Sequence, residues 1–158
     1  MGVEIERKFL VSEEKALEYL EKAQAGEYEY RVIEQAYLTT NPVVRVRKSD
    51  DAYYMTYKGN GFISREEYNL PLTEEAYDIL KSKADGHIIS KTRIHIPYGK
   101  LVIELDVFEA PFDYIRMAEV EFETLPDAET FIKPEWFLEE VSNDTEYHNS
   151  TLSRKVFK

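Results

Sequence analysis

The chain has 158 residues, a formal net charge of −11 at pH 7, 43% hydrophobic residues and no cysteine. The length and hydrophobic content predict one globular domain over residues 1–158. The acidic balance argues against nucleic-acid binding, and the lack of cysteine excludes disulfides and thiolate metal sites. Because no apolar run approaches the ~20 residues that span a bilayer, we expect a cytoplasmic protein without a membrane partner.

The first predicted element is the alternating run at residues 4–10. Successive side chains of a β-strand point to opposite faces, so Glu4, Glu6 and Lys8 share one face of this strand. Ile5 and Phe9 share the other face. One face of the strand is therefore charged and the other mostly apolar.

A helix and a second strand are expected next. Ser12, followed by two glutamates, is typical of a helix N-cap, and Gly26 marks the end of that helix. Residues 28–38 mix aromatic, β-branched and polar side chains, which predicts a strand whose facing the pattern leaves open.

Three short strands separated by turns follow. Arg45 and Arg47 share one face of the first, and Lys58 and Arg65 lie in the next two. The predicted ranges are 43–48, 53–58 and 65–70. Thr73 then caps a second helix, which we expect to run to about residue 84.

The last predicted strands carry segregated charges. The strand at 87–97 places Lys91, Arg93 and His95 on one face, and the strand at 101–108 alternates acidic with apolar residues. The strand at 115–124 holds three alternating carboxylates, Glu119, Glu121 and Glu123. Short helical signals follow at residues 127–132 and near the end of 143–153.

Two arrangements of these strands are compatible with the pattern. The short turns imply an antiparallel sheet, which can lie open with its polar face in water. It can also close into an eight-stranded barrel with the charged face inward and the helices outside. The segregation of arginines and glutamates onto different strands favours the barrel. We therefore predict an α+β, mainly β fold, a closed eight-stranded antiparallel β-barrel with a charged lumen.

Such a lumen has the groups for phosphoryl chemistry. Clustered carboxylates suit Mg²⁺ or Mn²⁺, whereas the three scattered histidines disfavour zinc. Lysines and arginines on neighbouring strands suit phosphate oxygens. The chain lacks both a P-loop and a GxSxG nucleophile motif, so direct attack by water is the simplest reaction. Lys91, close to Arg93, is the candidate general base because neighbouring cations lower the pKa of a lysine.

The ordered motifs resemble those of the CYTH domain, also called the triphosphate tunnel metalloenzymes. Glu4, Glu6 and Lys8 match the family's ExExK signature. Further matches are Gln35–Leu38, Arg45–Arg47, Thr56–Lys58, Ser64–Tyr68, Lys91–Arg93, Glu104–Phe108, Ala118–Phe122, Asp144, Tyr147 and Asn149.

The resemblance implies a tunnel that binds a small-molecule triphosphate with Mg²⁺ or Mn²⁺. The implied metal ligands are Glu4, Glu6, Glu119, Glu121 and Glu123. The implied substrate-binding residues are Lys8, Arg45, Arg47, Lys58, Arg65, Lys91 and Arg93. Lys91 also matches the lysine proposed as general base in the short bacterial members, and we expect Glu121 to be essential for metal-dependent turnover.

The chain looks most like the stand-alone bacterial members that hydrolyse inorganic tripolyphosphate to pyrophosphate and phosphate. A class IV adenylate cyclase, a nucleoside or thiamine triphosphatase, and a non-catalytic polyphosphate or nucleotide sensor remain alternatives. Glu67 and Asp106 could contact metal or balance arginines. Tyr37 and Trp136 are expected to pack outside the barrel, and a homodimer is compatible with the aromatic content.

Overall fold

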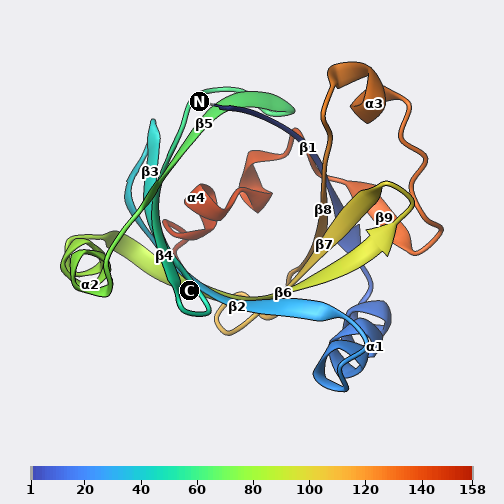
Figure 1. The fold of residues 1–158 in the computed structure, drawn as a ribbon, viewed down its shortest axis with the longest axis horizontal. Helices are drawn as coiled ribbons and strands as arrows, with labels where there is room; N and C mark the ends of the chain where they lie inside the picture. The colour runs from blue at the N-terminus through green and yellow to red at the C-terminus, as the bar shows by residue number, and fades with distance from the viewer. Residues whose placement is uncertain (1, 158) are drawn as a thin grey trace.

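In the computed structural model, which describes residues 2–157, one antiparallel sheet curls round until its ends meet (Figure 1). The strands are β1 (Gly2–Val11), β2 (Glu29–Thr40), β3 (Val43–Ser49), β4 (Ala52–Lys58), β5 (Ser64–Pro71), β6 (Asp85–Tyr98), β7 (Leu101–Phe108), β8 (Arg116–Glu121) and β9 (Phe137–Glu140). The helices are α1 (Glu13–Gln24), α2 (Glu74–Ser82), α3 (Leu125–Glu129), the 3₁₀ turn η1 (Thr145–Tyr147) and α4 (Asn149–Leu152).

The barrel closes through the first strand. The strand order is β5-β4-β3-β2-β6-β7-β8-β1, and Gly2–Ile5 of β1 pairs back onto β5, so these eight strands form a closed ring. Closure leaves no long unpaired edge among them. The predicted closed barrel is confirmed. The short strand β9, which pairs with Phe9 and Val11 beyond the β5 contact, was not predicted.

The strand register gathers the charged side chains on one face of the sheet. Directly opposed residues of neighbouring strands point to the same side, and the structure pairs Glu6 with Glu121, Lys8 with Glu119, and Arg93 with Asp106. A slip of one residue would turn the alternating apolar side chains away from the core, so their burial fixes this register. The charged face lies inside the barrel, and the alternative of an open sheet with its polar face in water is wrong.

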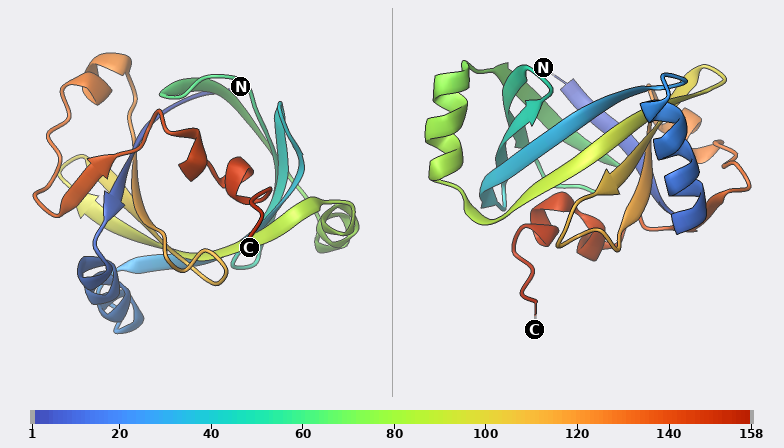
Figure 2. Two further views of the ribbon diagram at one scale, coloured as in Figure 1. Left: turned by 180° about the vertical axis from the view of Figure 1, so that it is seen from behind. Right: turned by 90° about the horizontal axis from the view of Figure 1, so that it is seen from below.

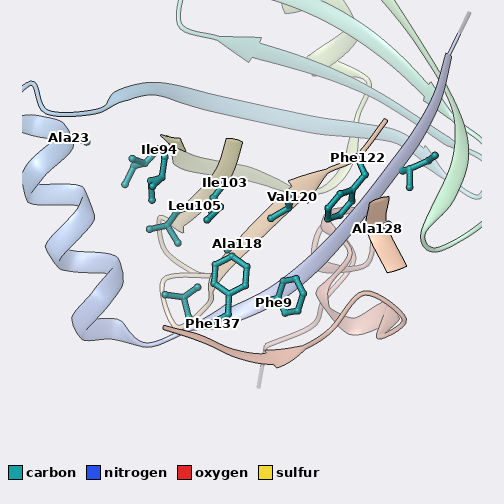
Figure 3. Packing of buried hydrophobic residues seen from close by; sticks show 13 residues of the cluster. Phe9, Ala23, Ile94, Ile103, Leu105, Ala118, Val120, Phe122, Ala128 and Phe137 are labelled. Carbon is teal, nitrogen blue, oxygen red and sulfur yellow. The ribbon is translucent and has the colours of Figure 1, made fainter. Parts of the chain in front are cut away.

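The main hydrophobic core lies outside the barrel wall. Figure 3 shows Phe9, Leu105 and Val120 packing with Phe137, and the Phe9 and Phe137 rings are 4.8 Å apart. Phe9 is 1% exposed, and burial of such a side chain contributes about 1.5–3 kcal/mol. Helix α1 packs here, and its first turn is capped by the Ser12 hydroxyl, which accepts a hydrogen bond from the Lys15 amide.

Helix α2 covers a second part of the outer wall. Its Tyr77 packs on Ala36 of β2 and Val46 of β3, and the Thr73 hydroxyl caps its first turn as predicted. Both expected helices therefore lie outside the barrel (Figure 1). None of the helices within residues 2–157 is long and apolar enough to cross a bilayer.

Helix α4 lies at one end of the barrel, within the outline of the ring (Figures 1 and 2). Its Leu152 packs with inward apolar side chains of the wall, among them Tyr37, Ile89 and Met117. The chain after α4 is held to β6, where the His87 amide donates a 2.6 Å hydrogen bond to the Ser153 carbonyl. One end of the lumen is thus filled by apolar side chains and this short helix.

Candidate active site

The inward face of the barrel surrounds a cavity of about 360 Å³. Every predicted site residue except Glu123 lines it. These residues are Glu4, Glu6, Lys8, Arg45, Arg47, Lys58, Arg65, Lys91, Arg93, Glu119 and Glu121. The wall also contains Glu67 and Glu104, so basic and acidic side chains from seven strands face one enclosed space.

Glu123 lies away from this cavity because β8 ends at Glu121. The chain then turns, and the Thr124 hydroxyl caps α3 by accepting a hydrogen bond from the Asp127 amide. Glu123 lines a neighbouring open hollow with His95 and Ile132, and Glu104 and Glu121 border both spaces. The alternation that predicted Glu123 on the same strand face as Glu121 therefore ends with β8, two residues before Glu123.

Lysines bridge the carboxylates of the first strand. The Lys58 ammonium donates a 2.8 Å hydrogen bond to Glu4, and the Lys8 ammonium lies 3.6 Å from Glu6 and 3.8 Å from Glu119. Burying a charge is tolerated when it is paired, so these contacts stabilise the acidic side of the cavity.

Asp106 lies behind the cavity wall, where it forms buried ion pairs with Arg93 and Lys91. The Arg93 guanidinium donates to both Asp106 oxygens, at 2.7 and 2.8 Å, and to Glu119 at 2.9 Å. Lys91 also donates to Asp106, at 2.7 Å. Asp106 is 0% exposed and does not line the cavity, so its contacts fit charge balance rather than metal binding.

The carboxylates of the cavity differ in how strongly their surroundings favour the ionised form. Burial, and then Glu4 and Glu104, raise the pKa of Glu121 to about 7. Burial and the adjacent Glu119 raise the pKa of Glu6. Burial also opposes ionisation of Glu119, but Arg93 and Lys8 outweigh it and hold the pKa of Glu119 well below its usual range. A bound cation would relieve this repulsion.

Lys91 is held in a state that favours loss of its proton. Burial lowers its pKa to about 7, with Arg93 and Arg47 acting in the same direction against the attraction of Asp106. Lys91 is 1% exposed and lines the cavity. Its amine can therefore accept a proton near neutral pH.

Three cavity residues come from segments whose facing the sequence pattern left open. Tyr37, expected outside, lines the cavity from β2, which corrects that prediction, whereas Trp136 packs outside as expected. His148 and Asn149 line it from the tail. Burial, with Lys8 and Arg65, lowers the pKa of His148 to about 4, so this ring is neutral at pH 7. Tyr37 points to the same face of β2 as Gln35. The pairing of these two residues with Arg45 and Arg47 of β3 shows that this face is the inner one.

The donors of the cavity fit a hard divalent cation. Glu4, Glu6, Glu119 and Glu121 offer only carboxylate oxygens, the ligand type that such ions prefer. Within residues 2–157 no group of three acidic or histidine side chains forms a ready-made metal cage. Mg²⁺ commonly takes one or two carboxylates and completes its shell with water and phosphate oxygens. The residues therefore fit an ion that binds together with a phosphate ligand.

Comparison with known proteins gives one consistent relationship. A model of the CYTH domain matches residues 2–155. An inorganic triphosphatase of Nitrosomonas europaea is 35% identical over 158 residues, which cover 97% of this chain and 98% of the relative. An inorganic triphosphatase of Acetivibrio thermocellus is 34% identical over 161 residues, covering 100% of this chain and 97% of the relative. A crystal structure of an inorganic triphosphatase matches with a TM-score of 0.67 at 31% identity, covering 99% of this chain and 97% of the other. The chain therefore belongs to the CYTH domain family, as the ordered motifs of its sequence predicted.

Proposed function

We propose that the protein hydrolyses inorganic tripolyphosphate to pyrophosphate and phosphate in the barrel cavity. The observation that carries this proposal is an enclosed space in which seven lysine and arginine side chains face carboxylates. The cations suit the phosphate oxygens and the carboxylates suit a divalent metal. The inorganic triphosphatases that resemble the chain over nearly its whole length support the same substrate.

Membership of the CYTH family implies dependence on a divalent metal. We propose Mg²⁺ or Mn²⁺, held by the four carboxylates that line the cavity, Glu4, Glu6, Glu119 and Glu121. When bound, the metal neutralises phosphate charge and makes a coordinated water more acidic. We leave Glu123 out of the proposed set because it does not line the cavity.

Arg45 illustrates how the cavity would hold phosphate. Its Nε atom is buried and has no hydrogen-bond partner. The residue is 8% exposed and lines the cavity. An unpaired buried donor costs about 1–3 kcal/mol, and a phosphate oxygen would satisfy it. Arg47 on the same strand face adds a second guanidinium, and Lys8, Lys58, Arg65 and Arg93 complete the proposed set.

Lys91 is the proposed general base. It takes a proton from the attacking water as the water oxygen forms a bond to phosphorus, and the bridging P–O bond breaks with its electron pair leaving on the released phosphate. The lowered pKa of about 7 leaves a large neutral fraction of Lys91 at physiological pH. The remaining cations hold the chain of phosphates and stabilise the charge that develops on its oxygens.

A substrate panel tests the proposed function. Tripolyphosphate, pyrophosphate, ATP and thiamine triphosphate are each incubated with Mg²⁺ and with Mn²⁺, and phosphate, pyrophosphate and cyclic AMP are measured. We expect the highest kcat/KM for tripolyphosphate. Cyclic AMP formed from ATP would favour the adenylate cyclase alternative, and faster turnover of ATP or thiamine triphosphate would favour those substrates. Tight binding of tripolyphosphate without turnover by either metal would leave the sensor alternative.

A further inference from the structure

A chain of side-chain hydrogen bonds connects the cation wall to Lys91 through the tail of the protein. Arg47 donates two hydrogen bonds to Oε1 of Gln35, at 2.9 and 2.6 Å. The Gln35 Nε2 atom donates to Oδ1 of Asn149 at 2.8 Å, and Lys91 donates to the same oxygen at 3.1 Å. Gln35 is 0% exposed and Asn149 is 8% exposed, so water competes little for these groups.

The chemistry of Arg47 fixes the orientation of every amide in this chain. A guanidinium has donors only, so Gln35 must present its oxygen to Arg47 and its amide nitrogen to Asn149. Asn149 must then present its oxygen, which leaves an acceptor for Lys91. The donor and acceptor roles of two amides, which are ambiguous by shape alone, are settled by their connection to one arginine.

We propose that Asn149 is a positioning residue for Lys91, whose amide oxygen accepts one of the two N–H bonds of the neutral amine so that the nitrogen lone pair faces the cavity. This inference rests on the proposed function, in which Lys91 is the base. A neutral lysine amine has two N–H donors and one lone pair around a tetrahedral nitrogen. Asp106 accepts one N–H at 2.7 Å and Asn149 accepts the other. The one position left on the nitrogen belongs to the lone pair, and Lys91 lines the cavity.

Asn149 is suited to this role because its oxygen is neutral. The charged groups that act on Lys91 are Asp106 from β7, Glu119 from β8, Arg93 from β6 and Arg47 from β3. A second carboxylate at the Asn149 position would favour the ammonium form, which has no lone pair. An apolar side chain there would leave the amine free to rotate. Asn149 orients the amine without stabilising its charged form, and the tail that carries it is held to β6 by the Ser153 carbonyl.

Two substitutions at Asn149 separate orientation from charge. Asn149→Leu is similar in size and removes the acceptor, so we expect kcat to fall ~10-fold to ~100-fold, with KM within about threefold of wild type. Asn149→Asp keeps an oxygen acceptor but adds a charge. We expect the rising limb of its kcat/KM profile to move about one unit to higher pH, with activity recovering above that limb. Thr151→Ala, on an exposed position of the same helix, serves as the matched control.

A merely structural role for Asn149 would lower stability or raise KM but leave the rising limb where it is. An unmoved limb in Asn149→Asp, or a kcat within about threefold of wild type in Asn149→Leu, overturns the proposal. Thermal unfolding and calorimetric binding of tripolyphosphate establish that each variant is folded. If an Asn149 variant does not fold, Gln35→Met, which removes the hydrogen bond to Asn149 without touching Lys91, must lower kcat; its KM is expected to rise as well, because Gln35 also accepts two hydrogen bonds from Arg47.

Failure of the proposed function has a different signature. If wild-type protein turns over no triphosphate, the reaction assigned to the cavity is wrong. The link between Asn149 and Lys91 can then be measured by NMR titration of the Lys91 side chain. A higher pKa of Lys91 in Asn149→Asp than in wild type supports the contact, and an identical pKa overturns it.

Discussion

Glu121 lies near several other carboxylates of the cavity wall. Its pKa is raised to about 7 by burial and by neighbours such as Glu4 and Glu104, a sign of unrelieved repulsion. We predict that Glu121→Gln, which keeps the size but removes the charge, lowers metal-dependent turnover more than ~100-fold. The measurement is phosphate release from tripolyphosphate over a metal titration. Glu123→Gln tests the exclusion of Glu123 from the metal ligands, and the turnover of this variant should stay within about twofold of wild type. Wild-type activity in Glu121→Gln would mean that the metal site is misplaced.

Lys91 should give the enzyme a rising pH limb. Burial lowers its pKa to about 7 from the usual value of 10.5, so the neutral base form increases as pH rises through about 7. The kcat/KM profile reports groups of the free enzyme, and we predict that it rises through the same region. With saturating metal, which keeps the Glu121 carboxylate ionised, Lys91→Ala should lower kcat ~10²-fold or more, remove this limb and change KM much less. Restoration of turnover by added methylamine would identify a lost base, whereas an unchanged limb in Lys91→Ala would exclude it.

Sequence reasoning works at the residue scale wherever alternation is regular. Glu6, Lys8, Arg45 and Arg93 lie in clean alternating runs, and each lines the cavity as predicted. Tyr37 lies in a mixed run with polar and apolar residues on both faces, so only the pairing of β2 with β3 and β6 reveals its direction.

The elements themselves follow from local rules, whereas the position of short ones does not. The capped helices α1 and α2 and the strand β7 lie close to their predicted bounds. Strand β9 has only four residues after Pro134, too few for an alternation signal, and it exists because β1 extends beyond its pairing with β5. Helix α4 was expected in the tail, but its place at the barrel end depends on Leu152 meeting apolar side chains from distant strands.

Gly86 of β6 lies close against Ser153, the residue that follows α4, and this close approach supports a stability prediction. Its φ is 83°, and an added Cβ would lie 2.1 Å from the Ser153 carbonyl oxygen. Gly99 also has a positive φ, 61°, but a Cβ there would meet nothing within 4 Å. Gly99→Ala should therefore cost only the backbone strain, about 1–2 kcal/mol, and Gly86→Ala distinctly more. Urea unfolding measures both free energies. Equal losses would show that the tail moves aside without cost.

At the scale of the whole molecule, a protein of net charge −11 is proposed to bind a polyanion. Closure of the barrel makes this feasible because it concentrates Arg45, Lys91 and the other inward cations in one enclosed space, shielded from the acidic exterior. Alternation predicted the two charged faces, and the segregation of arginines and glutamates onto different strands favoured closure without identifying the strands that meet. Closure depends on β1 pairing with β5, residues about sixty positions apart in the chain, and no local pattern encodes such a contact.

The same charge balance predicts that phosphate and metal stabilise the fold together. Tripolyphosphate alone brings negative charge beside Glu4, Glu6 and Glu119, and the metal alone competes with Lys8 and Lys58 for those carboxylates. When both are bound, the phosphates contact the lysines and the metal contacts the carboxylates.

At a ligand concentration 100 times Kd the gain in the free energy of unfolding is about 2.7 kcal/mol, which corresponds to a rise in Tm of about 5–10 °C. We expect thermal unfolding with Mg²⁺ or Mn²⁺ and tripolyphosphate to exceed the sum of the separate shifts. EDTA should reverse the excess, and Arg45→Gln should reduce it. Additive shifts would mean that metal and phosphate occupy independent sites.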